Sequence, residues 1–122
     1  MAREAIKRKR QSAEKRGHMA EYIAALYLFA KGYRILSLRY KTALGEIDIV
    51  AKRSDSIVFI EVKRRAGYSQ AIDAVNYHSQ QRIRSASDLW MARHPNAQRY
   101  STRYDIIAIR PLALPRHVIN AF

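Results

Sequence analysis

Four charged residues occupy alternate positions in two short apolar segments, Glu46 and Asp48 in the first and Glu61 and Lys63 in the second. Side chains of a β-strand alternate between faces, so the two members of each pair share a face if both segments are strands. A turn at residues 53–56 pairs the strands as a hairpin with Asp48 opposite Glu61. Like charges placed directly opposite each other destabilise a sheet. The spacing therefore predicts a carboxylate pair that needs a compensating cation.

Two cations can fill that role, a lysine and a divalent metal ion. Mg²⁺ is typically held by one or two carboxylates together with water and substrate phosphate oxygens. An ion between Asp48 and Glu61 would polarise a phosphodiester and position a water molecule. Lys63 would orient or deprotonate that water or stabilise the developing charge, and Glu46 would bind a second ion or hold Lys63. In the alternative interpretation, the acidic side chains form salt bridges with nearby lysines and arginines, which are common on strands and contribute little.

Glu21 is a further carboxylate with small residues around it. Gly17 lies about one helical turn before it and Ala24 about one turn after it, so this surface can approach another element closely. We expect Glu21 to lean over the sheet toward Asp48 and to supply another metal ligand. The alternative is an exposed glutamate that pairs with a nearby cation such as Lys15.

The elements that must position these side chains follow the order helix, three strands, helix, strand. Apolar residues at helical spacing predict the first helix, for which Gly32 is a natural stop, and β-branched and aromatic residues predict the strands. The order predicts an α/β fold with a restriction endonuclease-like core, in which helices flank a mixed β-sheet. A basic, flexible arm or the frayed start of a helix is expected at residues 1–12, a single domain at 13–122, and an irregular C-terminus after Pro111. The predicted elements are residues 13–31, 33–40, 46–51, 57–63, 70–93 and 104–109.

The composition favours a polyanionic partner. The 122 residues carry a net charge of +13, and a surface of this kind attracts nucleic acid, although an acidic protein partner is the alternative. The absence of cysteine excludes disulfides, thiolate metal sites and thiol nucleophiles. The longest nearly apolar run, residues 22–30, is much shorter than the roughly 20 residues of a membrane span. We therefore expect a cytoplasmic protein without a membrane partner.

Several basic and polar residues near the central constellation are candidates for nucleic-acid binding. Arg64 and Arg65 directly follow the second strand, and Gln81 and Arg82 lie in the second helix. Contacts to backbone phosphates require only positive charge and hydrogen-bond donors, so these four are predicted to line a phosphate groove. A solvated strand end and helix surface are the alternative. The four histidines show no metal-ligand spacing, and the single tryptophan, Trp90, is expected in the core.

At these residues the chain resembles two related groups of proteins. Asp48 followed by Glu61-x-Lys63 at the end of an apolar strand resembles the PD-(D/E)xK nuclease motif. Over roughly residues 14–122 the chain resembles the YraN family, an uncharacterised bacterial family related to archaeal Holliday junction resolvases. The blocks that carry this resemblance are Gly17-x-x-x-Glu21-x-x-Ala24, Gly32-Tyr33, Gly45-Glu46-Ile47-Asp48, Phe59-Ile60-Glu61-Val62-Lys63, Arg103-Tyr104-Asp105 and Asn120-Ala121-Phe122.

The resemblance implies a restriction endonuclease-like core, a site for Mg²⁺ or Mn²⁺, and a DNA substrate, with branched or junction DNA as the relevant form. It implies a homodimer by analogy only. The chain departs from the family pattern at Ser79, where a lysine is usual, and at Arg39, where an asparagine is frequent. Gln81 or Arg82 would have to substitute for that lysine. The residues to which the resemblance assigns catalysis are Glu21, Glu46, Asp48, Glu61 and Lys63, and the metal ligands among them are Glu21, Asp48 and Glu61.

The sequence therefore predicts a Mg²⁺-dependent endonuclease that hydrolyses phosphodiester bonds in DNA. The main alternative is a nucleic-acid-binding module with a weak or lost active site, which Ser79 favours. A third interpretation is an interaction protein whose acidic cluster is structural.

Overall fold

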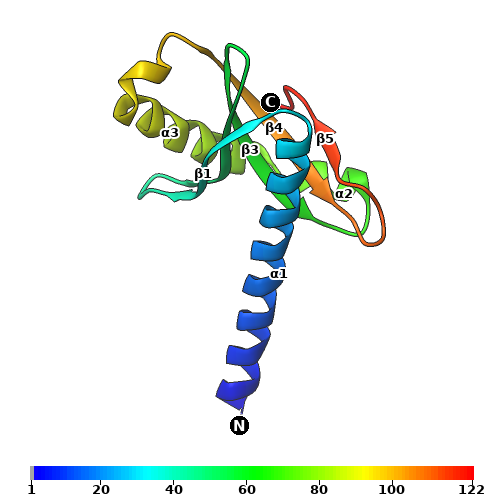
Figure 1. Ribbon diagram of the computed structural model, residues 1–122. Coiled ribbons are helices and arrows are strands. Elements are labelled where there is room, and N and C mark those ends of the chain that lie inside the picture. The colour runs from blue at the N-terminus through cyan, green and yellow to red at the C-terminus, as the bar shows by residue number, and fades with distance from the viewer. Residues whose placement is uncertain (1) are drawn as a thin grey trace.

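A mixed sheet with the strand order β1-β2-β3-β4-β5 forms the centre of the structure, a computed structural model that describes residues 2–122 (Figure 1). Strands β3 and β4 are parallel, and every other neighbouring pair is antiparallel. The helices flank this sheet, so the predicted mixed α/β architecture is confirmed. The strands are β1 (Arg34–Lys41), β2 (Glu46–Arg53), β3 (Ser56–Arg64), β4 (Ser101–Ile109) and β5 (Arg116–Val118).

Helix α1 (Ala2–Ala30) covers one face of the sheet with its C-terminal part. The helix ends at Ala30, and Gly32 in the following turn has a φ of 93°, which is accessible to glycine at little cost. The Tyr33 amide donates to the Leu28 carbonyl across this end. Ala20, Ala24 and Leu28 pack against small and branched side chains of the sheet. The buried members of this first core are Ala20, Ala24, Leu28, Tyr33, Ile49, Ala51, Val58, Ile60, Val62, Ile107 and Ile109.

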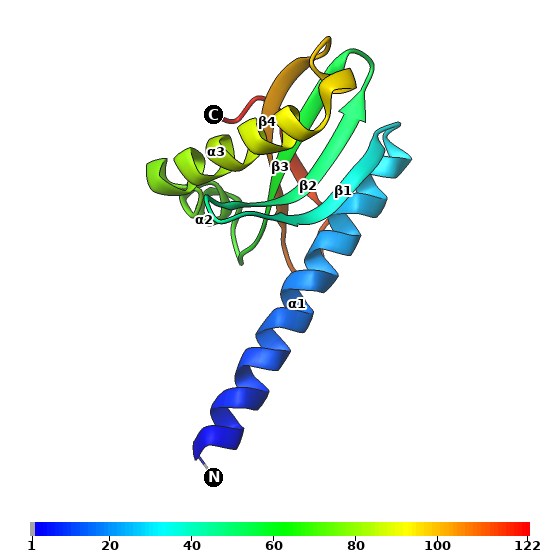
Figure 2. The ribbon, with the colours of Figure 1, turned by 90° about the vertical axis from the view of Figure 1, so that its left-hand side faces the viewer.

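Helix α3 (Tyr77–Arg93) covers the opposite face, as the rotated view shows (Figure 2). Asn76 caps its N-terminus by accepting a hydrogen bond from the Ser79 amide at 3.0 Å. The short helices α2 (Tyr68–Asp73) and η1 (Pro95–Ala97) complete the crossover between the parallel strands. The buried members of this second core are Ile47, Val50, Ile57, Phe59, Val75, Ile83, Ala86, Trp90, Ala97 and Ile106.

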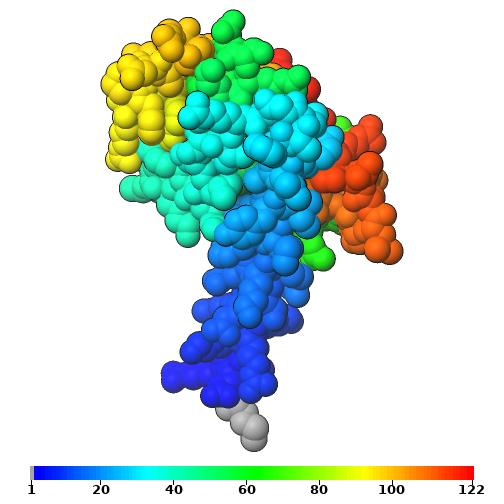
Figure 3. All heavy atoms as spheres, in the orientation of Figure 1, coloured from blue at the N-terminus to red at the C-terminus, as the bar shows by residue number. Residues whose placement is uncertain are grey.

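The N-terminal part of α1 extends away from the body of the molecule (Figures 1 and 3). Residues 2–19 are all exposed, which corresponds to about 27 Å of helix at 1.5 Å per residue. Residues 1–12 were expected to be a flexible arm or the frayed start of a helix. Met1 lies outside the described residues, and residues 2–12 continue the helix, whereas the main helix was expected to begin only at residue 13. The flexibility of this segment stays a prediction.

A buried polar network joins β4 and β5 at the side of the sheet away from β1. The Asp105 carboxylate, which is 0% exposed, accepts hydrogen bonds from the Arg103 guanidinium and, at 2.7 Å, from the His117 ring. Burial favours a raised pKa for Asp105, but these bonds and one from the Asn120 amide outweigh it and hold the pKa below its usual range. The network explains why a charged residue is accommodated in an otherwise apolar strand.

Two element predictions differ from the structure. The helix expected at residues 70–93 is split into α2 and α3, because Asn76 has extended backbone (ψ 177°) and caps the second helix. The C-terminus, expected to be irregular, contains β5, which pairs with residues 106–108 of β4. None of the helices within residues 2–122 combines the length and the apolar character that crossing a lipid bilayer requires.

Candidate active site

The ladder between β2 and β3 stops where the carboxylates begin. The predicted hairpin register is confirmed for Lys52 with Ile57 and for Val50 with Phe59. The antiparallel pairing continues only to Ile49 with Ile60. The expected backbone pairing of Asp48 with Glu61, and of Glu46 with Lys63, is therefore wrong.

The Asp48 side chain closes the end of this ladder. Its Oδ2 accepts a hydrogen bond from the Val62 amide at 2.8 Å and thereby takes the place of a backbone carbonyl. Ile47 packs in the core beneath α3 and Ile49 in the core beneath α1, so the regular alternation of β2 breaks at Asp48. The two strands therefore separate at this point and leave room beside the carboxylates.

Asp48 and Glu61 still meet through their side chains. Burial, the hydrogen bond with Asp48 and the negative charge of Asp48 together raise the pKa of Glu61 to about 10, and burial contributes most. The charge of Lys63 acts in the opposite direction, and Glu46 adds to the rise. Near neutral pH Glu61 is therefore protonated, so it is the group that a bound cation would have to deprotonate.

A cavity of about 300 Å³ opens beside this pair between the sheet and α3. Its sheet wall carries Glu46, Asp48 and Glu61, and its helix wall carries Ser79 and Arg82. Gly45 brings the start of β2 against α3, since a Cβ at this position would overlap the Arg82 carbonyl. This close approach places the Arg82 segment opposite the carboxylates. Gln81, by contrast, is exposed on α3 and does not line this cavity.

Glu21 reaches the same region from α1, where it is 9% exposed. Burial raises its pKa, and the negative charges of Asp48 and Glu46 add to this rise. Its Oε2 accepts a hydrogen bond from the Arg39 guanidinium at 3.0 Å, so the cation is neither Lys15 nor a neighbour on the helix.

Arg39 is the residue of this region that the sequence interpretation did not assign. Its φ of 50° lies in the left-handed region, where asparagine and glycine are tolerated better than arginine. Its guanidinium also donates to the Tyr22 hydroxyl at 3.2 Å. The signal in the sequence was the departure from asparagine at this position, but only the fold shows that the arginine pairs with Glu21.

Arg64 and Arg65, two of the four predicted phosphate contacts, lie together in a second hollow. Lys63, Arg64 and Arg65 line this hollow of about 260 Å³, and Arg16 of α1 forms its opposite wall. Lys63, whose positive charge lowers the pKa of Glu61, thus lies between the carboxylates and a hollow whose charged lining residues are all basic.

The donor set at the acidic cavity suits a hard divalent cation in part. Among residues 2–122, no three His, Asp or Glu side chains already converge closely enough to hold a metal by themselves. Asp48 and Glu61 supply two carboxylates, which matches the way Mg²⁺ binds through one or two carboxylates with water and phosphate completing the octahedron. The residues therefore fit an open metal site and not a closed cage.

Comparisons with known proteins show which family this arrangement belongs to. Residues 20–109 match the family described as "Uncharacterised protein family UPF0102". A UPF0102 protein of Agrobacterium fabrum is 57% identical over 122 residues, 100% of both chains. A UPF0102 protein of Rhizobium etli is 58% identical over 117 residues, 96% of this chain and 93% of the other. The match extends over most of the chain, and this YraN-like protein therefore belongs to the uncharacterised protein family UPF0102.

Proposed function

We propose that this protein is a metal-dependent endonuclease that hydrolyses phosphodiester bonds in DNA, with branched or junction DNA as its substrate. The observation that supports this most is the meeting of Asp48 and Glu61 in a cavity at the point where β2 and β3 separate. Two carboxyl groups in contact are a costly arrangement for a merely structural role, since one partner must stay neutral or find a cation. An open cavity beside them gives a divalent ion and a phosphate access.

Asp48 and Glu61 would hold Mg²⁺ or Mn²⁺, with Glu21 or Glu46 as an additional ligand, directly or through water. The ion supplies polarisation of the scissile phosphate and a more acidic water. Asp48 is oriented for this role because the Val62 amide fixes its Oδ2. Lys63 stabilises the charge that develops on the phosphate or orients the attacking water.

The substrate surface would combine the basic hollow with the extended helix. Arg64 and Arg65 lie beside Lys63, and Arg82 faces the carboxylates from α3. Residues 2–16 of the exposed part of α1 carry seven lysines or arginines and two glutamates. Because these contacts address the phosphate backbone, we expect binding that depends on DNA shape and salt concentration and little on sequence. A homodimer, which the family resemblance implies, would let two such sites act on one junction.

The decisive experiment is a cleavage screen with purified protein and Mg²⁺ or Mn²⁺. Branched, flapped, duplex and single-stranded DNA and RNA substrates are compared for wild type, Asp48→Asn and Glu61→Gln. Loss of one metal-binding carboxylate should lower the cleavage rate by about a hundredfold or more, since metal stabilisation of the transition state contributes several kcal/mol. Asp88→Asn, an exposed acid on α3, is the matched control and should cleave like wild type. Full activity of both cavity variants would refute the proposed site.

The alternative is a nucleic-acid-binding module that no longer cleaves. Two observations favour it. Ser79 stands in the cavity wall where the family usually has a lysine, and Arg39 already pairs with the Glu21 carboxylate. Salt-sensitive DNA binding, with no cleavage of any substrate in the presence of any metal tested, would select this function. If DNA does not bind, and a divalent ion neither binds nor raises the melting temperature, the acidic cluster is structural and the protein binds another partner.

A further inference from the structure

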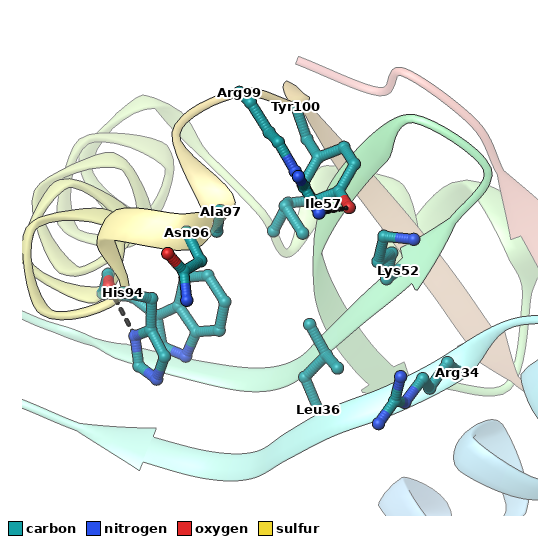
Figure 4. A pocket seen from close by; sticks show the side chains of 10 residues that line it. Arg34, Leu36, Lys52, Ile57, His94, Asn96, Ala97, Arg99 and Tyr100 are labelled. Carbon is teal, nitrogen blue, oxygen red and sulfur yellow. Dashed lines mark hydrogen bonds between the residues drawn. The ribbon is translucent and has the colours of Figure 1, made fainter.

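A separate cavity of about 370 Å³ lies at the other end of α3 (Figure 4). It is bordered by β1, β2, the last turn of α3 and η1, and it contains none of the carboxylates of the acidic cavity. Lys52 in its wall follows Asp48 by four residues on β2, which places the two cavities about 13 Å apart along the strand. Its volume is within the range of small-molecule pockets, about 300–1,000 Å³.

Three cations surround this cavity, and no acidic residue lines it. Within residues 2–122, Arg34, Lys52 and Arg99 form no salt bridge, whereas Arg39 and Arg103 each do. Three unpaired positive charges at one hollow repel one another, and an anion with several oxygens would relieve this repulsion.

The Tyr100 ring holds two of these cations in position. The Lys52 ammonium lies 4.6 Å from the ring centroid and the Arg99 guanidinium 4.9 Å from it. Arg99 also donates a hydrogen bond of 2.8 Å to the Tyr100 hydroxyl. Figure 4 shows Arg99 and Tyr100 side by side on one wall of the cavity. Because an aromatic ring cannot neutralise a cation, both charges stay available to a ligand.

The opposite wall offers a flat surface and a polar edge. The His94 ring stacks on the Trp90 ring, with centroids 3.8 Å apart and planes 12° from parallel. His94 Nδ1 donates to the Trp90 carbonyl at 2.7 Å, which fixes the imidazole orientation. Trp90 is buried, while His94 is exposed and presents its other side. The amide of Asn96, which can donate and accept, lines the same wall.

We propose that this cavity is a nucleotide-binding site, with the phosphate held by Arg34, Lys52 and Arg99 and the base placed against His94 and Asn96. The ligand is either a free nucleotide or a nucleotide at the end of a nucleic-acid strand, since both present the same phosphate and base. The site is independent of the proposed cleavage, because it uses none of the residues of the acidic cavity. A stacked base contributes about 1–3 kcal/mol at sites of this kind, so the base should add to the affinity of phosphate alone.

Binding is measured by calorimetry and by the emission of Trp90, the only tryptophan, whose ring contacts His94. The probes are a nucleoside, the corresponding nucleoside monophosphate and diphosphate, inorganic phosphate, and a short oligonucleotide with and without a 5′-phosphate. A nucleoside diphosphate should bind at least about tenfold more tightly than either the nucleoside or inorganic phosphate. Tighter binding of the 5′-phosphorylated oligonucleotide than of free nucleotide identifies a strand end as the source, and the reverse order identifies a free nucleotide.

Arg34→Gln, Lys52→Met and Arg99→Gln should each weaken nucleotide binding about tenfold, because each removes one charged hydrogen-bond donor. Lys52→Arg should retain binding, and Arg116→Gln, an exposed arginine on β5, is the control with the same loss of charge. Melting temperatures show that each variant is folded. Equal binding of nucleotide and inorganic phosphate, or unchanged nucleotide affinity in all three variants, overturns the proposal. Asp48→Asn should bind nucleotide like wild type, so loss of cleavage and loss of this site are distinguishable.

Discussion

Replacing Glu61 by glutamine should stabilise the fold near neutral pH. The carboxyl has an ordinary pKa of 4.5 when the chain is unfolded, and burial beside Asp48 raises it to about 10 in the folded protein. Between these two values the folded state binds more protons than the unfolded state. The free energy of unfolding therefore decreases as the pH rises through this window. Glutamine has no ionisable proton, and its amide can still donate to Asp48.

The size of the effect follows from the same two values. Neutral pH lies about two and a half pH units above the unfolded pKa, and each unit corresponds to about 1.4 kcal/mol, which sets an upper limit of about 3 kcal/mol. Glu61 is partly exposed in the cavity, so solvent screens some of this penalty. We expect Glu61→Gln to increase the free energy of unfolding by about 1–3 kcal/mol near pH 7 and by very little near pH 4.

The assay is urea unfolding of wild type, Glu61→Gln and the surface control Asp88→Asn across this pH range, without divalent ions. Wild type and Asp88→Asn should lose stability in parallel as the pH rises, whereas Glu61→Gln should lose less. Mn²⁺ should restore stability to wild type near pH 7, because a bound cation replaces the proton of Glu61, and should do so less for Glu61→Gln. A Glu61→Gln variant that is less stable than wild type near pH 7 would refute the assignment of the raised pKa.

Three other substitutions test the surroundings of the site. Gly45→Ala should destabilise the fold by about 1–3 kcal/mol in urea unfolding, because its Cβ overlaps the Arg82 carbonyl, and a variant as stable as wild type would contradict that packing. Asp105→Asn should lower the free energy of unfolding by about 3 kcal/mol, because it removes the buried negative charge to which Arg103 and His117 both donate. Preserved stability would show that the fold does not need this network. Arg39→Asn should increase Mn²⁺ affinity in calorimetry, because it frees Glu21 and relieves the left-handed backbone, and unchanged affinity would exclude Glu21 as a ligand.

The sequence was sufficient for strands β1 to β4 because their signals are local. β-branched and aromatic residues and a polar turn determine the β2–β3 hairpin and its register as far as Ile49. The divergence at Asp48 was not predictable in this way, since it depends on a side chain that replaces a backbone acceptor. The sequence left two alternatives for residues 1–12, a flexible arm or the frayed start of a helix, because no buried residue marks this segment with an apolar pattern. Strand β5 is only three residues long, too short for a periodic signal.

The candidate site shows the same division between local and long-range information. Glu46, Asp48 and Glu61 share one cavity because they lie on neighbouring strands, which spacing alone predicts. The pairing of Glu21 with Arg39 joins residues 18 positions apart and requires the packing of α1 on β1. The cavity proposed to bind a nucleotide likewise combines two strands with the end of α3, and the separate sequence signals of His94 and Trp90 gave no reason to join them.

The acidic cavity balances its negative charge in two ways without a metal ion. A proton neutralises Glu61, and Arg39 neutralises Glu21. A divalent ion must displace the proton and compete with the arginine, so metal binding should weaken as the pH falls, which distinguishes this site from one with ionised ligands only. Ser79 departs from the family pattern, but it changes the charge of the cavity little. Arg82, one helical turn away, supplies positive charge to the same cavity wall. The proposed activity therefore depends on whether metal and substrate together outcompete Arg39 and the proton.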